Sequence, residues 1–160
     1  MVRQVGPETA AEAMKSAMPI LEEEIKRRGV MRESLGTVVI GTVFGDIHDI
    51  GKTMVATVLM AEGFSVHDLG INITTEQFLG AVKEYRPNIL AMSSLLTTSA
   101  LEQKKVIEIL GKEGLRDKVK VMVGGGAITE EFAKKIGADG YEATAPGAAK
   151  LAKRLIGVEK

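Results

Sequence analysis

Residues 37–51 read TVVIGTVFGDIHDIG, and this stretch decides the fold. Residues 37–44 are apolar and rich in β-branched side chains, which is typical of a buried strand covered on both faces. A helix-like run from Lys52 to Glu62 follows, so residues 45–51 form a strand-to-helix loop. In parallel α/β sheets such loops lie at the carboxyl ends of the strands, where ligands bind. The two carboxylates and the imidazole of this loop therefore mark a candidate site.

The rest of the chain repeats this alternation of strand and helix. Thr74 and Gln77 form a capping-box signal at the start of one helix, and Thr129 and Gly137 are typical start and stop residues of another. Alternation of this kind predicts an α/β fold with a doubly wound parallel sheet. We expect strands at 37–44, 64–69, 88–92, 118–123 and 139–142, and helices at 51–62, 74–85, 100–110, 129–137 and 145–156.

A flavodoxin-like (Rossmann-like) five-stranded sheet with the order 2-1-3-4-5 is the usual arrangement for such a chain. This order places the loops after the first and third strands on either side of the point where the strand order reverses. We therefore expect residues 45–51 to lie beside the hydroxyl-rich segment 93–99, with the glycines of 124–126 beyond it.

Composition excludes several classes of function. The chain has 160 residues, the size of one ordinary domain, with 21 Lys and Arg against 21 Asp and Glu, so no net basic charge favours nucleic acid. It has no cysteine, which excludes disulfides, thiolate metal sites and cysteine nucleophiles. No apolar run approaches the ~20 residues of a membrane span, and the N-terminus has no signal-peptide pattern. We expect a cytoplasmic protein that binds neither membranes nor nucleic acid.

His48 is the candidate metal ligand of the loop. A ligating imidazole nitrogen must be unprotonated, and the other ring nitrogen needs a hydrogen-bond partner that fixes the tautomer. We expect Asp46 to be that partner, because it precedes His48 by two residues. A short pattern of this kind also leaves open a solvated polar turn with an incidental histidine.

The pattern Asp46-x-His48-x-x-Gly51 resembles the signature of cobalamin-binding domains, in particular those of methyltransferase corrinoid proteins and of methionine synthase. The resemblance implies a cobalamin cofactor, present as methylcobalamin or cob(I)alamin. It also implies that His48 is the lower ligand of cobalt and replaces the cofactor's own dimethylbenzimidazole base, the arrangement called base-off/His-on.

The loops after the third and fourth strands match the same family. Ser93-x-Leu95 resembles its serine-x-leucine element, and Gly124-Gly125 resembles its double glycine. The resemblance implies that these loops hold the displaced nucleotide tail. A slot for a flat base and a sugar-phosphate needs backbone without Cβ atoms, which Gly124 and Gly125 provide, and hydroxyl groups, which Ser93 and Thr97 provide.

Ser99 and Ala145 complete the implied site. Ser99 matches the serine of the family's histidine-aspartate-serine relay, in which it would hydrogen-bond Asp46. Ala145 falls where the family's last cofactor contact lies. No residue is expected to act as a catalytic nucleophile. The expected cofactor-binding residues are Gly45, Asp46, Ile47, His48, Asp49, Gly51, Ser93, Leu95, Thr97, Gly124, Gly125 and Ala145.

The resemblance implies a methyl-carrier protein of one-carbon metabolism that does not turn over alone. In the resembling systems, cobalt does the bond chemistry and the protein supplies the ligand, its proton relay and its orientation. The implied partners are a methyltransferase specific for the methyl donor, a second methyltransferase that uses tetrahydrofolate or a thiol as acceptor, and a reductive activase.

We expect residues 1–33 to form an N-terminal helix and residues 34–160 to form the cobalamin-binding domain. The helix resembles the last helix of the four-helix cap that precedes this domain in methyltransferase corrinoid proteins, and the earlier helices of such a cap are absent here. Its apolar stripe has two interpretations: packing on the chain's own domain, or, as a hypothesis, packing against a second copy of the chain. We expect a partner to shield the upper face of the corrin. The stripe consists of Met14, Met18, Leu21 and Ile25.

Other interpretations stay open at this point. The small cobalamin-binding subunit of an adenosylcobalamin mutase shares these motifs. A receiver-like signalling module without a cofactor would need acidic residues after the first and third strands, yet the third ends in Ser93. Flavin binding is another alternative. Asp49 and Lys52 also have a plain interpretation as charges at a helix end.

Overall fold

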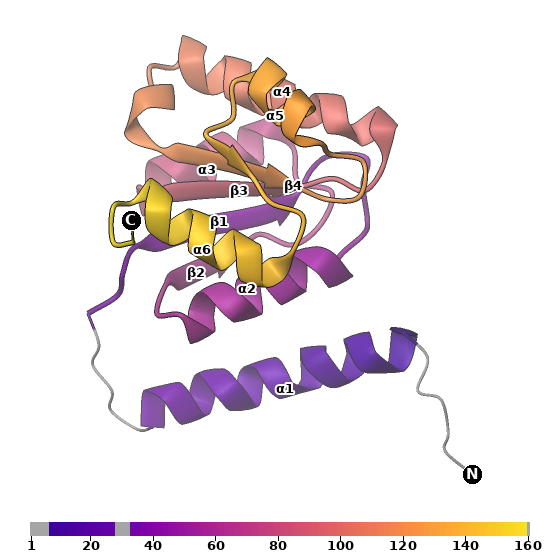
Figure 1. Cartoon of the computed structure of the whole chain (residues 1–160), viewed down its shortest axis with the longest axis vertical. Coiled ribbons are helices and arrows are strands. Elements are labelled where there is room, and N and C mark those ends of the chain that lie inside the picture. Colours follow the sequence, from indigo (N-terminus) through magenta and orange to yellow (C-terminus); the bar gives the residue numbers. More distant parts are fainter. Residues whose placement is uncertain (1–6, 28–32, 160) are drawn as a thin grey trace. The chain divides into compact units, whose positions relative to one another are not determined.

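The computed structural model describes residues 7–27 and 33–159, and the chain separates into two units, residues 1–33 and 34–160 (Figure 1). The first unit contains helix α1, Pro7–Arg27, where the sequence predicts a helix. None of the described helices is both long and apolar enough to cross a membrane.

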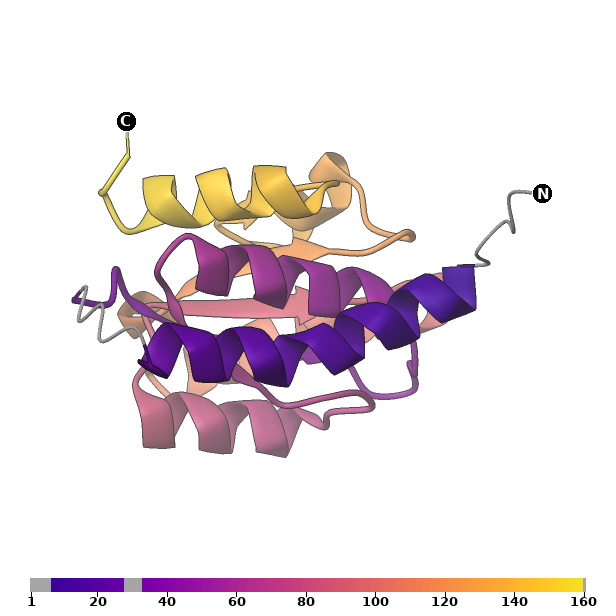
Figure 2. The same ribbon diagram turned by 90° about the horizontal axis from the view of Figure 1, so that it is seen from below.

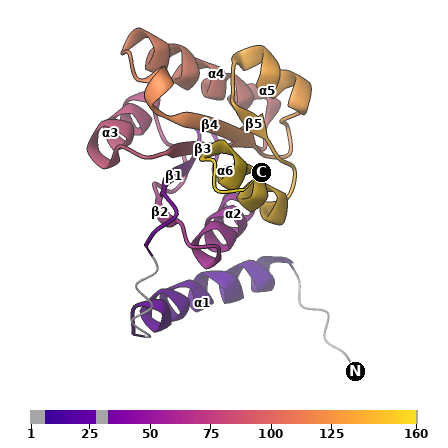
Figure 3. The same cartoon turned by 60° about the vertical axis from the view of Figure 1, so that its left-hand side comes forward.

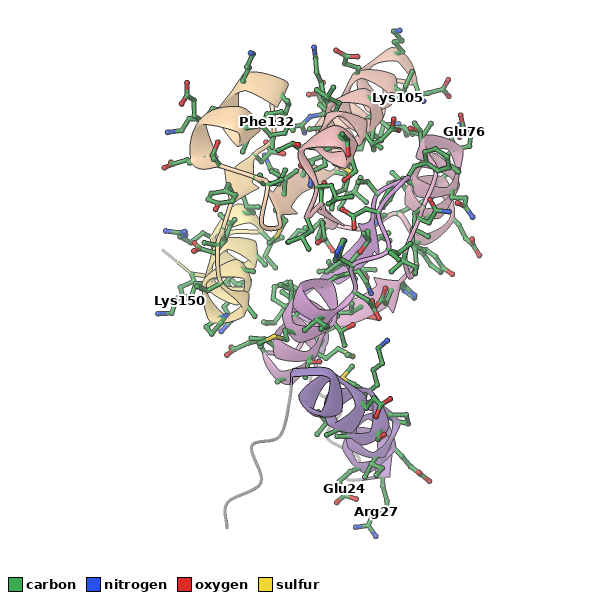
Figure 4. The ribbon with its side chains drawn as sticks, turned by 90° about the vertical axis from the view of Figure 1, so that its right-hand side faces the viewer. Glu24, Arg27, Glu76, Lys105, Phe132 and Lys150 are labelled. Carbon is green, nitrogen blue, oxygen red and sulfur yellow. The ribbon has the colours of Figure 1, made fainter. Side chains whose placement is uncertain are left out.

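Helix α1 carries an ion pair on its surface. The Nε atom of Arg27 lies 3.0 Å from Oε2 of Glu24, one helical turn earlier (Figure 4). The side chains of Met14 and Ile25, two members of the predicted apolar stripe, lie outside the described part of the structure. The predicted packing of this stripe therefore stays a prediction.

The second unit is built on a five-stranded parallel sheet with the order β2-β1-β3-β4-β5. This is the flavodoxin-like order that the sequence predicts, and it places β1 and β3 at the centre of the sheet. The strands are β1 Thr37–Thr42, β2 Ser65–Asp68, β3 Ile89–Ser93, β4 Lys120–Gly124 and β5 Gly140–Tyr141.

Helices cover both faces of the sheet (Figure 3). Helices α2 and α6 lie side by side on one face (Figure 2), and α3, α4 and α5 cover the other. Glu76, Lys105 and Lys150 point outward from α3, α4 and α6 (Figure 4), so these helices have polar outer surfaces. The helices are α2 Ile50–Ala61, α3 Thr75–Tyr85, α4 Thr97–Lys112, α5 Glu130–Ile136 and α6 Ala145–Leu155, with a 3₁₀ turn η1 at Arg116–Lys118.

Strand β1 is buried on both faces, as the sequence predicts. Val38 and Ile40 belong to the apolar core shared with α2 and α6, and Val39 belongs to the core shared with α3, α4 and α5. All three side chains are at most 2% exposed. Burial of this kind contributes about 2 kcal/mol for each aliphatic side chain. The strand that carries the histidine loop is therefore held by packing on both faces of the sheet.

The predicted helix signals are present. Thr74 and Gln77 form a complete capping box at the start of α3, and Thr129 caps α5. Gly137 ends α5 in the left-handed conformation, with φ 80°. The sequence alone predicts these helix ends because each depends on residues within one turn of the end.

Several boundaries differ from the sequence prediction by one to three residues, and two of them lie next to the candidate site. Strand β1 ends at Thr42 instead of residue 44, and Val43 continues only as an isolated bridge to Ile73. Helix α4 begins at Thr97, three residues before the predicted start at Ala100. A side chain on a distant loop, described below, accepts hydrogen bonds from the start of this helix. A local sequence pattern could not predict that contact.

Candidate cofactor-binding site

Four loops meet at the carboxyl edge of the sheet, namely residues 43–49, 94–96, 125–129 and 142–144 (Figure 1). A cavity of about 1000 Å³ lies among these loops, the ends of β1, β3 and β4, and the helices α2 and α6. The sheet order brings the loop after β1 beside the loop after β3, as predicted. The candidate site thus lies at the point where the strand order reverses.

Asp46 links the two central loops. Its side chain is completely buried. Oδ1 accepts the backbone N–H of His48 at 2.9 Å and faces Nδ1 of the His48 ring at 2.7 Å. Oδ2 accepts the backbone N–H of Leu95 at 2.8 Å and the hydroxyl of Ser99 at 2.9 Å. One carboxylate therefore fixes the histidine and the start of α4 together.

The surroundings of Asp46 favour its charged form. Burial by itself raises the pKa of a carboxyl group, but here the backbone N–H groups of His48 and Leu95, the His48 ring and the Ser99 hydroxyl outweigh burial. Together they hold the pKa of Asp46 well below its usual range. Asp46 is therefore a carboxylate at neutral pH and acts only as an acceptor.

His48 presents one ring nitrogen away from Asp46. Because the Asp46 carboxylate can only accept, Nδ1 must carry the proton, and this leaves the lone pair on Nε2. None of the described residues hydrogen-bonds Nε2. The side chain is 47% exposed at the cavity, and its backbone carbonyl accepts the hydroxyl of Thr42 at 2.9 Å. A ring held in this way could bind a metal ion through Nε2.

Two polar residues that the sequence analysis did not select support this edge. The buried hydroxyl of Ser94 lies 2.7 Å from that of Ser99. Nε2 of Gln103, on the inner face of α4, donates to the carbonyl oxygens of Met92 at 3.1 Å and Gly124 at 3.3 Å. Gln103 stands one helical turn after Ser99, so the inward-facing spacing of α4 was the available signal.

The glycines after β4 are required by backbone packing. Gly125 has φ 114°, and a Cβ atom there would lie 1.9 Å from the carbonyl oxygen of Ser94. A Cβ atom on Gly124 would lie 3.2 Å from the carbonyl oxygen of Glu142. The structure shows that Gly125 allows two neighbouring loops to approach each other. Both glycines also line the cavity, so their predicted role in giving space to a ligand stays a prediction.

Most of the predicted site residues line the cavity, and three do not. Asp46 lies behind His48, Gly45 begins the loop at φ 79°, and Thr97 is exposed at the start of α4. The lining also includes Met54 and Val55, which follow Gly51 at helical spacing on α2 and could have been found by that spacing. The predicted residues that line the cavity are Ile47, His48, Asp49, Gly51, Ser93, Leu95, Gly124, Gly125 and Ala145.

Comparison with known proteins identifies the class of this site. The family model of the B12 binding domain matches residues 36–150. A corrinoid protein from Desulfitobacterium hafniense is 46% identical over 149 residues, which cover 92% of this chain and 69% of the relative. Dimethylamine corrinoid protein 1 from Methanosarcina mazei is 45% identical over 147 residues, which cover 92% and 68%.

Solved structures agree with these relatives. The methanol:cobalamin methyltransferase complex from Methanosarcina barkeri contains a chain with 30% identity and a TM-score of 0.78, and the match covers 96% of this chain and 58% of that one. A signal receiver domain from Mycobacterium tuberculosis matches at 18% identity with a TM-score of 0.58 and covers 78% of this chain and 98% of its own. This second likeness shows a shared fold alone.

The fold and the site define a cobalamin-binding α/β domain, and the chain belongs to the B12-binding domain family. Within that family it is a corrinoid protein of the kind found in methyltransferase systems, and its cofactor is cobalamin. The predicted family and cofactor are thus confirmed. The finding favours cobalamin over the receiver-like and flavin interpretations.

The cavity fits such a cofactor. It lies on the side of the sheet covered by α2 and α6, and His48 stands at its edge with Nε2 available to a metal. Gly51 lines the cavity, and a Cβ atom there would meet no protein atom within 4 Å, so the first turn of α2 leaves open space. Ile47 and Leu95 are 71% and 45% exposed, which provides apolar surface for a flat macrocycle.

We expect Asp46→Asn to lower the free energy of unfolding of the apo-protein by about 3 kcal/mol, because an amide offers one acceptor oxygen where two are used. Ser99→Ala, which removes one donor, should cost about 1 kcal/mol.

The low pKa of Asp46 contributes stability above the pH at which a carboxyl titrates in the unfolded chain, about 4, and this contribution is lost as the pH falls further. Urea unfolding at pH 7 and pH 3 measures both effects. Equal stabilities of wild type and Asp46→Asn at pH 7 would contradict this account.

Gly125→Ala should both destabilise the fold and weaken cobalamin retention by about tenfold or more, since its Cβ atom would displace the backbone at Ser94. Gly114→Ala is the matched control. Gly114 also has a positive φ, 68°, but a Cβ atom there meets nothing within 4 Å, so only about 1 kcal/mol of backbone strain is expected. Thermal unfolding and retention of hydroxocobalamin on gel filtration measure the two effects. If both variants behave alike, crowding against Ser94 is not the cause.

Proposed function

We propose that this chain binds cobalamin base-off/His-on, with Nε2 of His48 on cobalt, and carries a methyl group between two methyltransferases. The observation that carries the proposal is the 2.7 Å contact between Nδ1 of His48 and the buried carboxylate of Asp46. A carboxylate behind a ligating histidine fixes its tautomer and makes it a better ligand. An incidental histidine in a solvated turn would not need a buried carboxylate partner.

The polar residues His48, Asp46 and Ser99 have different roles in this proposal. His48 holds the metal through Nε2 while Nδ1 keeps its proton toward Asp46. Were Nε2 released from the metal, the Asp46 carboxylate would still hold the ring through Nδ1 and would stabilise any positive charge that develops on it. Ser99 donates to Oδ2 of Asp46 at 2.9 Å and keeps the carboxylate in place during both states. These residues form the predicted relay.

Cobalamin, when bound, supplies a cobalt ion that accepts and releases a methyl group. In our proposal the protein contributes binding and orientation. Ile47 and Leu95 support the macrocycle, while Ser93, Gly124 and Ala145, which line the cavity, surround the displaced nucleotide tail. The chain has no role in methyl transfer beyond this in our proposal, so it does not turn over without partners.

The partners that we propose are a methyltransferase that takes the methyl group from its donor, a second one that passes it to tetrahydrofolate or a thiol, and a reductive activase. Support comes from the relative in the methanol:cobalamin methyltransferase complex and from the relatives named dimethylamine and trimethylamine corrinoid proteins. Methylamines are therefore the donors to test first.

We also propose that helix α1, Pro7–Arg27, corresponds to one helix of a helical cap and mediates a homodimer. The apolar stripe predicted from the sequence is the reason, because an apolar face on a separate helical unit needs a partner. Sedimentation of the holo-protein at micromolar concentration should show a dimer that Leu21→Glu dissociates. A wild-type monomer at that concentration would contradict the dimer.

The proposed coordination is tested by the colour of the reconstituted protein. The protein is mixed with hydroxocobalamin, free cofactor is removed by gel filtration, and the visible spectrum is compared among wild type, His48→Ala and His67→Ala. His67 is the matched control, because it lies on β2 and stacks on the ring of Tyr85 at 3.9 Å, outside the cavity lining. We expect about one cofactor per chain in wild type and His67→Ala, and an altered spectrum in His48→Ala alone. A spectrum unaffected by His48→Ala would rule out histidine coordination.

A further inference from the structure

The histidine loop is held from its outer side by residues of the edge strand β2 and the turn that follows it. The carboxylate of Asp46 fixes the middle of the loop, but its first and last residues have other partners. Asn72 forms hydrogen bonds with the backbone at the start of the loop. Asp68 holds the end of the loop through its ion pair with Lys52. Neither Asp68 nor Asn72 lines the cavity. We call Asp68, Asn72 and Lys52 the brace.

Asn72 binds the start of the loop with its side chain and its backbone. Its Oδ1 accepts the N–H of Gly45 at 2.9 Å, and its own N–H donates to the carbonyl oxygen of Asp46 at 3.0 Å. Asn72 adopts φ 54°, in the left-handed region that asparagine tolerates better than most residues. The two bonds lie on either side of the Gly45–Asp46 peptide, so they fix the direction in which the loop leaves β1.

Lys52 binds the end of the loop. Its side chain is 1% exposed, and Nζ lies 2.6 Å from Oδ1 of Asp68 and 2.9 Å from Oδ1 of Asp49. Asp49 directly follows His48, and Asp68 is the last residue of β2. The interpretation of Lys52 as a simple charge at a helix end is wrong. A buried ammonium needs such partners, and the pair ties the first turn of α2 to the edge of the sheet.

We propose that Asn72 and Lys52 are positioning residues that set the orientation of His48 by holding both ends of its loop against β2. This inference rests on the proposed coordination by His48. A ligand on a loop binds well only if the loop is held near the bound geometry beforehand, because ordering it on binding costs conformational entropy. The contacts of the brace hold both ends of the loop in this way.

The test uses one variant at each end of the loop: Asn72→Gly removes one hydrogen bond, and Lys52→Met removes the ion pairs to Asp49 and Asp68. Asn72→Gly keeps the left-handed backbone and loses only the side-chain acceptor, whereas Asn72→Asp keeps an acceptor oxygen and is the conservative rescue. Lys52→Met keeps the length of the side chain and removes its charge. Asn88→Ala is the matched control, because Oδ1 of Asn88 accepts the N–H of Thr37 at 2.8 Å at the opposite end of β1.

Two readouts are compared. In the apo-protein, amide hydrogen exchange at Gly45 should rise about tenfold in Asn72→Gly and stay near wild type in Asn72→Asp and Asn88→Ala. In protein reconstituted with hydroxocobalamin, the wild-type and His48→Ala spectra define the histidine-on and histidine-off end points. The ratio of the histidine-on form to the histidine-off form should fall about fivefold in Asn72→Gly, because the variant loses one hydrogen bond. The same ratio should fall about tenfold in Lys52→Met.

The outcomes separate this inference from the proposed function. If wild type and His48→Ala have the same spectrum, histidine coordination fails and the positioning role fails with it. If those two spectra differ but Asn72→Gly and Lys52→Met both keep the wild-type ratio, only the positioning role is overturned. If Asn88→Ala lowers the ratio as much as Asn72→Gly does, general destabilisation explains the result and the inference is also overturned. Asn72→Gly settles the question even if Lys52→Met does not fold.

Discussion

The structure of this site depends on one buried carboxylate. Asp46 is fully buried, and such a charge is tolerated only where donors replace the water that it has lost. Its donors come from its own loop and from a loop 49 residues further along the chain, and both loops must be in place at once. Formation of the site and docking of the β1 and β3 loops are therefore a single event.

The sheet order makes this arrangement available. With β1 and β3 adjacent, the loops that follow them emerge side by side, and Ser99 on the first turn of α4 comes within reach of Asp46. The same contacts fix one side of the His48 ring and leave the rest of it open to the cavity. Nδ1 of His48 is fixed by Asp46, whereas the ring as a whole is 47% exposed at the cavity.

The sequence predicted the sheet order, the core strand and most of the residues that line the cavity, because their signals are local or periodic. Thr74 with Gln77, and the apolar run through Val39, are examples. It could not predict that α4 begins at Thr97 or that Gly125 packs against Ser94, since both follow from contacts between distant loops. Lys52 was interpreted as a simple charge at a helix end for the same reason, because its partner Asp68 lies on a different element, strand β2. These long-range contacts build the site. The sequence therefore predicted the residues that line the cavity more clearly than the residues that hold them in place.

The central claim is that His48, and not the cofactor's own base, occupies the lower position on cobalt. The most direct measurement is the electron paramagnetic resonance spectrum of the protein reconstituted with cobalamin, reduced to the cobalt(II) state and prepared with ¹⁵N-labelled histidine. Our account predicts that each cobalt line is a doublet in labelled protein and a triplet in unlabelled protein. A triplet in both samples would show that the nitrogen on cobalt belongs to dimethylbenzimidazole, and it would contradict the account.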